Sequence, residues 1–436
     1  MRPRSLFWLG SALLLAACDD QIVSPVVPEE APVEGPKLTF GTPQYDGANA
    51  AAVDENGFVY VAGRTDGSLD GPHRGMADFF VRKYHPEGDV LWADQFGTHL
   101  HDEATGVAVD RSGNVYVVGR TEGSLAGSRG GFDAFMRKYD TNGLLQWTRQ
   151  FGWGLSGAHE FATGVAVNPD GSAVYVSANS TASGESDALV FKYSSDGDSI
   201  WTRVTSTPGG DYATGIAADA LGNVYVVGYT AGDLGPCCIP QGGNDAFIKK
   251  YDPNGLVWTR QFGTIGDDRA HAVAVDPFGN AILAGATLDP SRWGVSWDAF
   301  VRKYDGNGQL LFASTFGSSS DDQATAITVD DAGSYYVTGV TSGLLMAGHG
   351  KANAGGSDVF LYKYDVSDKL IWTTQFGTSA DDRASGIASL SLDPAQGPRI
   401  FIAGSTAGTL VGKNRGKYDA YLRCLGHLGS TIWTDQ

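Results

Sequence analysis

One sequence pattern recurs seven times between about residue 38 and residue 436 of this 436-residue chain. In the copy from Gly106 to Gly152, two short runs rich in Val and Tyr are followed by a glycine-rich loop. A third and a fourth short run then flank an Asp-Thr-Asn-Gly turn. The third run opens with aspartate in every copy, at Asp78, Asp133, Asp187, Asp245, Asp298, Asp358 and Asp419. Such a chain must fold as an array of equal units rather than as unrelated domains.

Each unit predicts four short β-strands separated by tight turns, and no window sustains a helical period. Seven four-stranded units favour an all-β fold, a seven-bladed β-propeller of four-stranded antiparallel blades over residues 37–436. This would be a single domain, because one blade cannot bury both of its faces alone. A linear β-solenoid is the alternative, but its repeats are shorter and lack four turn-bounded strands.

The two ends of the repeat region complement one another. A full unit ends Trp147-Thr-Arg-Gln-Phe-Gly152, whereas the last unit stops at Trp433-Thr-Asp-Gln436. The missing Phe-Gly pair stands at Phe40-Gly41. We therefore predict that residues 37–42 meet residues 431–436 and close the ring within one blade.

The run from Gly263 to Thr287 resembles the SBBP class of bacterial β-propeller repeats. The resemblance rests on Asp267-Asp268, Val273-Ala-Val-Asp276 and Gly279-Asn280, and related runs extend it over roughly residues 38–436. It implies an exported propeller, and it implies neither an activity nor catalytic residues.

The first 17 residues predict a targeting signal. Arg2 and Arg4 precede a short apolar run, and the sequence Leu15-Ala-Ala-Cys18 resembles a bacterial lipobox. This resemblance implies a lipoprotein with acyl chains such as palmitate on Cys18, which would anchor it to a membrane. An ordinary secretory signal containing a cysteine is the alternative. Residues 18–36 are rich in proline and acid and predict a disordered tether.

The expected location is therefore the bacterial cell envelope. The sequence does not distinguish the inner from the outer membrane, or exposure to the periplasm from exposure at the cell surface.

The chain has 31 Lys and Arg against 49 Asp and Glu, a formal net charge of −18. This balance argues against nucleic-acid binding, which needs a surplus of basic side chains.

The loops of such a propeller fall on two opposite faces. First-to-second and third-to-fourth connections are short Asp-containing turns, and they share what we call the tight-turn face. Second-to-third and blade-to-blade connections share the other face, which carries the variation in length and which we call the loop face. Binding residues usually lie on irregular loops held by a rigid scaffold, so we expect them on the loop face.

An acid recurs in each blade-to-blade loop, at Asp46, Asp102, Glu160, Asp211, Asp268, Asp322 and Asp382. These acids could bind a cation or could hold their own loops by hydrogen bonds, and their presence in all seven units favours the second role. The best metal candidates are the adjacent pairs Asp267, Asp268, Asp321, Asp322, Asp381 and Asp382. Calcium is the ion that such oxygen ligands would suit, but the spacing is not that of a calcium loop. No other cofactor is predicted.

A basic residue recurs in the third run, at Lys83, Lys138, Lys192, Lys250, Lys303, Lys363 and Arg423. A tryptophan recurs in the fourth, at Trp92, Trp147, Trp201, Trp258, Trp372 and Trp433, with Phe312 in the fifth copy. We interpret the basic residue as one ion pair or backbone contact per blade, not as a binding stripe.

Departures from the repeat are the better candidates for function. Trp153, Trp293 and Trp297 lie outside the repeated position and are candidate ligand-binding residues, although each could simply fill a gap between loops. Cys237 and Cys238 could form a vicinal disulfide or remain thiols. We expect the histidines of the loop face, including His271, to be surface residues.

These features favour a non-catalytic binding, scaffold or adhesion module for a protein or carbohydrate partner. No catalytic residue is predicted. The alternative is a propeller enzyme, either a quinoprotein-like oxidoreductase or a sugar-directed hydrolase or lyase. The Gly255 to Trp258 turn and the Cys pair resemble features of quinoprotein propellers, but no cofactor-binding set is visible.

Overall fold

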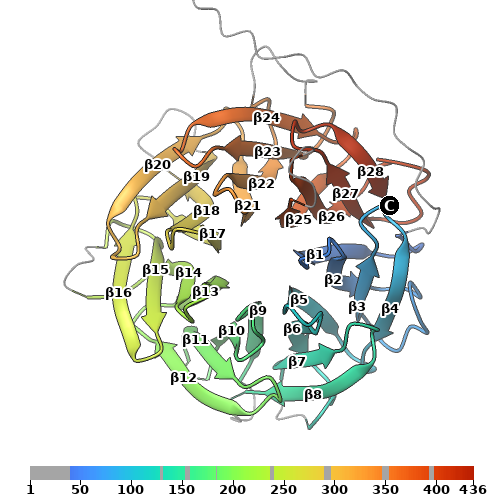
Figure 1. Ribbon diagram of the computed structural model, residues 1–436, viewed down its shortest axis with the longest axis horizontal. Coiled ribbons are helices and arrows are strands. Elements are labelled where there is room, and N and C mark those ends of the chain that lie inside the picture. Colours follow the sequence, from blue (N-terminus) through green and yellow to red (C-terminus); the bar gives the residue numbers. More distant parts are fainter. Residues whose placement is uncertain are drawn as a thin grey trace, which may run out of the picture.

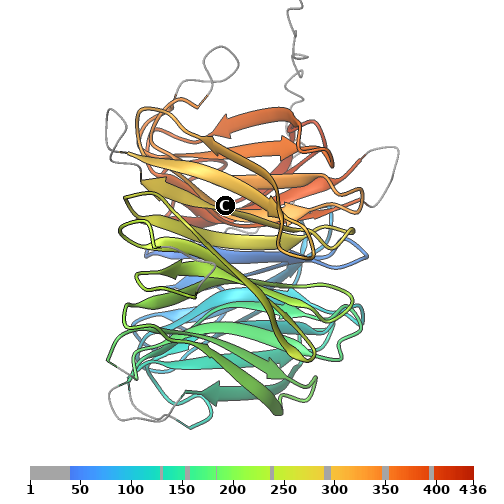
Figure 2. The same ribbon diagram turned by 90° about the vertical axis from the view of Figure 1, so that its left-hand side faces the viewer.

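A computed structural model describes residues 40–127, 131–152, 158–182, 184–235, 240–288, 296–345, 353–391 and 397–436. In this described part of the chain, twenty-eight strands form seven four-stranded antiparallel sheets arranged radially around an axis (Figure 1, Figure 2). The predicted seven-bladed propeller is confirmed. Within these ranges, no helical segment has the length and apolar character that crossing a bilayer requires.

Each blade contributes one strand to each of four concentric positions (Figure 1). The inner strands are β1 (Asp46–Val53), β5 (Asp102–Val109), β9 (Glu160–Val167), β13 (Asp211–Ala218), β17 (Asp268–Val275), β21 (Asp322–Val329) and β25 (Asp382–Leu390). The second strands are β2 (Val59–Thr65), β6 (Val115–Thr121), β10 (Val174–Ser180), β14 (Val224–Thr230), β18 (Ala281–Leu288), β22 (Tyr335–Thr341) and β26 (Arg399–Thr406).

The third strands are β3 (Asp78–Tyr84), β7 (Asp133–Tyr139), β11 (Asp187–Tyr193), β15 (Asp245–Asp252), β19 (Trp297–Tyr304), β23 (Asp358–Tyr364) and β27 (Asp419–Leu425). The outer strands are β4 (Val90–Phe96), β8 (Leu145–Phe151), β12 (Ser199–Thr205), β16 (Gly255–Phe262), β20 (Leu310–Phe316), β24 (Leu370–Phe376) and β28 (Thr431–Asp435).

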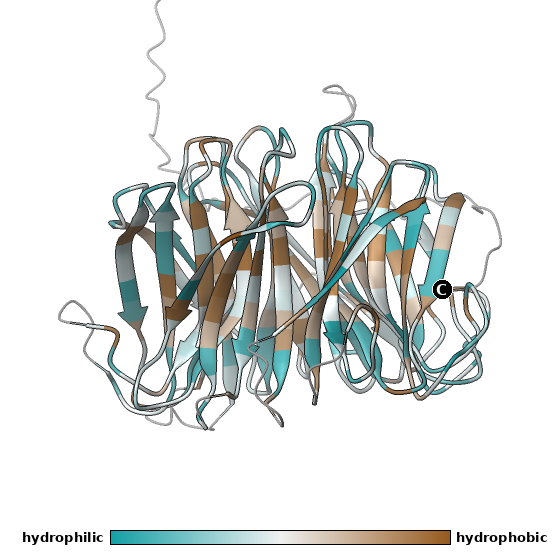
Figure 3. Cartoon of the chain, turned by 90° about the horizontal axis from the view of Figure 1, so that it is seen from below, coloured by the Kyte–Doolittle hydropathy of each residue, from teal (hydrophilic) through white to brown (hydrophobic). Residues whose placement is uncertain are grey.

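The hydrophobic core lies between neighbouring blades. Tyr60 and Val81 of the first blade, for example, pack in one buried cluster with Val117 and Phe135 of the second. The second and third strands are almost wholly buried because both of their faces meet another sheet, and Figure 3 shows the hydrophobic stretches along the stacked strands. Each blade therefore depends on its neighbours for its core.

The recurring Asp-x-x-Gly turns have a common geometry. Asp110 Oδ1 accepts hydrogen bonds from the backbone N–H groups of Ser112 and Asn114, both at 2.9 Å. Gly113 then takes a φ of 76°, which L-residues with a Cβ adopt only at a cost. Aspartate and glycine are thus the residues that this turn favours.

The ring closes between the first and seventh blades, where Figure 1 places the C-terminus. Phe40 is fully buried in a cluster with Trp433. The Arg82 guanidinium lies 4.3 Å from the centroid of the Phe40 ring. Gln436 accepts hydrogen bonds from Leu410 N at 2.7 Å and Val411 N at 2.9 Å, as Gln95 does from the corresponding loop of the first blade. Phe40 and Gly41 thus complete the seventh blade, as predicted; residues 37–39 lie outside the described part.

Candidate functional site

The recurring acids open the inner strands at the loop face, and all are buried. Asp102 Oδ2 accepts hydrogen bonds from Thr98 N at 2.6 Å and Thr98 Oγ1 at 2.9 Å. In the fourth blade, Thr230 Oγ1 at the end of β14 donates a hydrogen bond to Oδ1 of the corresponding acid, Asp211, at 2.6 Å. The six aspartates of this set each fasten a blade-to-blade loop to the blade that it enters, which confirms the structural role for them. Glu160 accepts a hydrogen bond from Ser180 Oγ at the end of β10 at 3.1 Å.

Burial raises the pKa of Asp102, Asp268, Asp322 and Asp382, and a neighbouring aspartate from the preceding blade adds to the shift. Hydrogen bonds from threonine or serine oppose the rise without cancelling it. These carboxyl groups are enclosed parts of the scaffold rather than groups that face solvent.

The other member of each aspartate pair binds a different loop. Asp267 Oδ1 accepts from Asn244 N at 2.9 Å, Asp321 Oδ1 accepts from Trp297 N at 3.0 Å, and Asp381 Oδ1 accepts from Ser357 N at 3.1 Å. Across the described ranges, no group of three or more His, Cys, Asp or Glu side chains is placed to hold a metal ion. Metal binding by Asp267, Asp268, Asp321, Asp322, Asp381 and Asp382 stays a prediction.

The residue before each recurring acid has a fixed backbone and a variable side chain. Its carbonyl accepts a hydrogen bond from the residue that follows the second strand, as Tyr45 O does from Asp66 N and His101 O from Glu122 N. The seven side chains at this position are Tyr45, His101, His159, Gly210, Asp267, Asp321 and Asp381. The loop face thus presents different chemistry on one repeated frame, which aligning the seven copies at this position would have revealed.

Three arginines near the central opening share one arrangement, which we call an arginine station: an arginine paired with a carboxylate and lying against one or two aromatic rings. Arg120, at the end of β6, donates from Nε and Nη2 to Glu103 Oε2 at 3.0 and 2.6 Å. Its guanidinium lies 5.4 Å from the ring centroid of Phe132 and 5.6 Å from that of Phe161.

The other two stations stand on different blades. Arg269, the second residue of β17, donates to Asp267 at 3.0 Å and lies 5.1 Å from the ring centroids of both Tyr229 and Trp297. Arg64, near the end of β2, pairs with Asp66 at 2.8 Å and lies 5.5 Å from the centroid of Tyr45.

The hydrogen bonds of one station lower the pKa of its carboxylate. Burial acts to raise the pKa of Asp267, but hydrogen bonds from Asn244 and Arg269 outweigh it and lower the pKa. Asp267 therefore stays ionised and holds its arginine in place.

Of the predicted tryptophans, Trp297 belongs to a station. It is the first residue of β19 rather than a loop residue, and it is partly buried under Arg269. Trp153, Trp293, Cys237, Cys238 and Cys18 lie outside the described residues. The arginines and the partner aromatic residues were missed, because only their position relative to the repeat distinguishes them from other surface residues.

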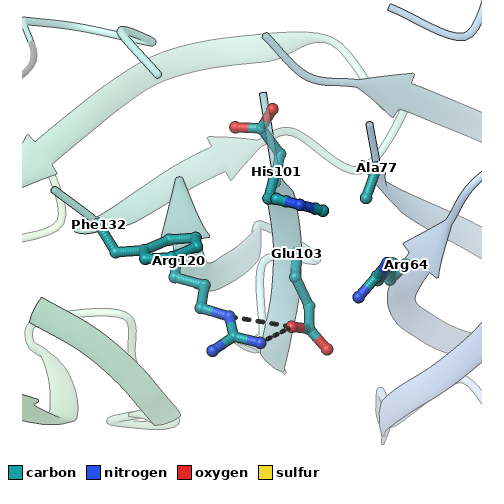
Figure 4. Close-up of a pocket in the computed structure, with 7 residues that line it drawn as sticks. Arg64, Ala77, His101, Glu103, Arg120 and Phe132 are labelled. Atoms are coloured by element: carbon teal, nitrogen blue, oxygen red, sulfur yellow. Dashed lines mark hydrogen bonds and ion pairs between the residues drawn. The ribbon is translucent and has the colours of Figure 1, made fainter. Parts of the chain in front are cut away.

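Two hollows lie side by side over the first, second and seventh blades. The first, of about 230 Å³, is lined by Arg64, Ala77, His101, Asp102, Glu103, Arg120 and Phe132. Figure 4 shows Arg64 on one side of Glu103, and Arg120 bonded to it from the other. The second, of about 250 Å³, is lined by Gln44, Tyr45, Arg64, Asp66 and Lys417, so Arg64 borders both.

The recurring lysine and tryptophan stabilise contacts between blades. Lys250 Nζ and Trp258 Nε1 donate to one acceptor, the carbonyl oxygen of Gly306 in the next blade, at 2.9 and 3.1 Å. Lys83 and Trp92 share Thr141 O in the same way. The expectation for His271 was wrong: it lies inside β17, and its Nδ1 is 2.9 Å from Ala324 O of the following blade.

Comparison with known proteins supports the repeat assignment. The SBBP beta-propeller repeat matches residues 40–70, 91–126 and 200–236. The regulatory protein FlaEY of Caulobacter vibrioides is 29% identical over 322 residues. The match covers 62% of this chain and 33% of FlaEY, so the chain spans about a third of that protein's length.

Solved structures share the fold at low sequence identity. A protein from Lactobacillus plantarum has a TM-score of 0.52 at 14% identity, covering 87% of this chain and 95% of its own. Hydrazine synthase of Kuenenia stuttgartiensis has a TM-score of 0.51 at 12% identity, covering 86% of this chain and 96% of its own. A puromycin hydrolase has a TM-score of 0.52 at 11% identity, covering 89% of this chain and 53% of its own. These similarities show the fold alone. The chain is thus a seven-bladed propeller in which three segments match the SBBP beta-propeller repeat.

Proposed function

We propose that this protein is a non-catalytic binding module that engages a protein or carbohydrate partner through the loop face. The observation that carries the proposal is the set of three arginine stations. Their side chains are already held by carboxylates and rings, so a ligand would meet them with little further loss of conformational entropy.

The N-terminal sequence supports a location of this module in the cell envelope. Lipid on Cys18 would anchor the protein to the inner or outer membrane of the envelope, and the tether over residues 18–36 would let the propeller reach its partner. The FlaEY relative, which is named a regulatory protein, fits recognition better than chemistry.

A propeller enzyme is the less favoured alternative. One structural neighbour is a hydrolase, but at 11% identity this similarity concerns the fold alone. The carboxylates of the three stations bind their own arginines, and their hydrogen bonds suit a positioning role.

Capture from an extract of the producing cells tests the proposal. The immobilised protein should retain a partner or a glycan, and Arg120→Ala and Trp297→Ala should each reduce the retained amount at least tenfold. Arg111→Ala is the matched control, because Arg111 is exposed in a turn of the tight-turn face and pairs with the equally exposed Glu55. Failure of the wild type to retain anything, or equal retention by all the variants, would overturn the proposal.

A further inference from the structure

We infer that the ligand of the loop face is an uncharged oligosaccharide, two of whose neighbouring sugar units occupy the two hollows on either side of Arg64. This inference rests on the proposed function and names its ligand class. Four properties of the two hollows support it: their size, their hydrogen-bonding groups, their charge and their aromatic rings.

The size of the hollows favours a ligand made of small units linked in a chain. Pockets for drug-sized ligands typically span roughly 300–1,000 Å³. The hollows measure about 230 and 250 Å³, so each suits one small polar group. Because Arg64 borders both, a ligand that fills both must be a chain of such groups that passes over this side chain.

The lining of the hollows suits hydroxyl groups, which both donate and accept hydrogen bonds. Arg64 and Arg120 present guanidinium donors beside the carboxylate acceptors Asp66 and Glu103. Glu103 is held a second time, because Asn49 Nδ2 donates to its Oε1 at 3.0 Å. Donors and acceptors therefore stand next to one another in fixed positions, as recognition of a sugar requires.

The charge balance argues against an ionic ligand. Each arginine that lines a hollow is paired with its own carboxylate, and the whole chain carries a formal charge of −18. An anionic ligand would be repelled at long range and would find both arginines already paired. A cationic ligand would be repelled by Arg64 and Lys417, which line the second hollow.

Aromatic rings stand at both hollows. Phe132 and His101 line the first hollow, and Tyr45 lines the second. Tyr45 is itself held by Tyr418 at a centroid distance of 5.6 Å. The electron-rich faces of such rings attract the partly positive C–H groups of a sugar ring.

A protein partner would favour another surface. The core of a protein interface is a desolvated and predominantly apolar patch. Exposed aliphatic side chains such as Leu91, Leu256 and Leu310 lie instead at the start of the outer strands, next to the tight-turn face. The described residues that line the two hollows include none of the large exposed aliphatic side chains.

A glycan microarray with uncharged and acidic oligosaccharides, followed by titration calorimetry of the best binder, tests the inference. We expect the full chain to bind an uncharged oligosaccharide, with a Kd that changes less than twofold between 50 and 500 mM NaCl. Arg64→Gln should weaken binding at least tenfold because Arg64 borders both hollows. Lys417→Gln should weaken binding two- to fivefold, and Arg111→Gln on the opposite face should leave it unchanged.

Other outcomes separate the two proposals. Preference for acidic glycans with a steep salt dependence, or equal binding by wild type and Arg64→Gln, would overturn the inference. If no glycan binds but the extract yields a protein that Arg120→Ala fails to retain, the ligand class is wrong and the binding function stands. If neither glycan nor extract component is retained, both proposals fail.

Discussion

Asp435 lies in β28, at the contact between the seventh and first blades. Its side chain is largely buried, accepts a hydrogen bond from Tyr84 Oη at 3.0 Å, and lies 3.8 Å from Arg82 Nη1. Burial raises the pKa of Asp435 to about 6, against the opposing effects of Arg82 and Tyr84. A carboxyl with a raised pKa in the folded state destabilises the fold when ionised, and this cost disappears on protonation.

Asp435→Asn should therefore change how stability depends on pH. Above the folded pKa of about 6, the wild type carries the ionised group at full cost. As pH falls from about 6 toward the unfolded value near 3.8, the wild type should gain on the order of 2–3 kcal/mol relative to the variant. Urea unfolding of both proteins between pH 4 and 7 measures this. If the free energy of unfolding of the wild type minus that of the variant is constant, or decreases as pH falls, the assignment is contradicted.

A second residue-scale feature is a pair of departures from the repeat. Turn glycines usually face the tryptophan of the preceding blade, and a Cβ added to Gly143 would lie 2.6 Å from the Trp92 ring. In the sixth blade, Asp368 replaces this glycine with a φ of 67°, the one positive value at a non-glycine residue in the described ranges. The preceding blade carries the smaller Phe312 at the tryptophan position. Asp368 instead accepts hydrogen bonds from Lys303 and Tyr335, both at 3.2 Å.

We expect Phe312→Trp to destabilise the protein by about 1–3 kcal/mol, because the larger ring meets the Asp368 side chain. Adding Asp368→Gly should recover part of this loss, with a favourable coupling of about 0.5–3 kcal/mol in a double-mutant cycle. Free energies of unfolding in urea measure the cycle. Strict additivity of the two substitutions would show that the positions do not compensate one another.

At the scale of single elements, the third and fourth strands of a blade act together. Lys250 and Trp258 are cross-strand neighbours, and both reach the carbonyl oxygen of Gly306. The sequence predicted a structural contact for the lysine. It did not predict that the tryptophan shares the acceptor, because the acceptor is a backbone atom 48 residues from Trp258, in another blade.

Removing both donors should lower the free energy of unfolding by more than the sum of the two single effects. Lys250→Met or Trp258→Phe alone leaves Gly306 O with one donor, whereas the double variant leaves it with neither. An acceptor without a partner costs about 1–3 kcal/mol, so we expect an excess of about 1 kcal/mol in unfolding measurements. Lys250→Met combined with Trp92→Phe is the matched control and should be additive, because these donors serve different carbonyls. Equal coupling in both pairs would contradict the shared acceptor.

At the scale of the whole molecule, the fold was predictable because the sequence repeats one four-strand pattern seven times. Turn aspartates and glycines, strand lengths and the split Phe-Gly motif are local signals, and each recurs in register. The candidate site was less predictable, because Arg64 and Arg120 share one position of the second strand that the other five blades fill with other residues, and Arg269 stands at a different position. Trp297 was found because tryptophan is rare outside the repeat, whereas the hollows depend on how neighbouring blades lie together.

Ring closure provides a test at this scale. Phe40→Ala should destabilise the protein by about 3–5 kcal/mol, because Phe40 is fully buried between the two ends of the chain. Phe278→Ala is the matched control: this side chain is 67% exposed, so we expect a change of roughly 0.5 kcal/mol or less. Thermal or urea unfolding measures both, and equal effects would contradict closure by Phe40.

Ligand recognition by the loop face is most directly tested by amide hydrogen–deuterium exchange of the full chain, with and without the glycan or partner that it captures. We expect ligand-dependent protection in the segments that carry Tyr45, Arg64, His101 and Arg120, and no change in the outer strands β16, β20 and β24. Protection confined to those outer strands or to the tight-turn face would contradict recognition by the arginine stations.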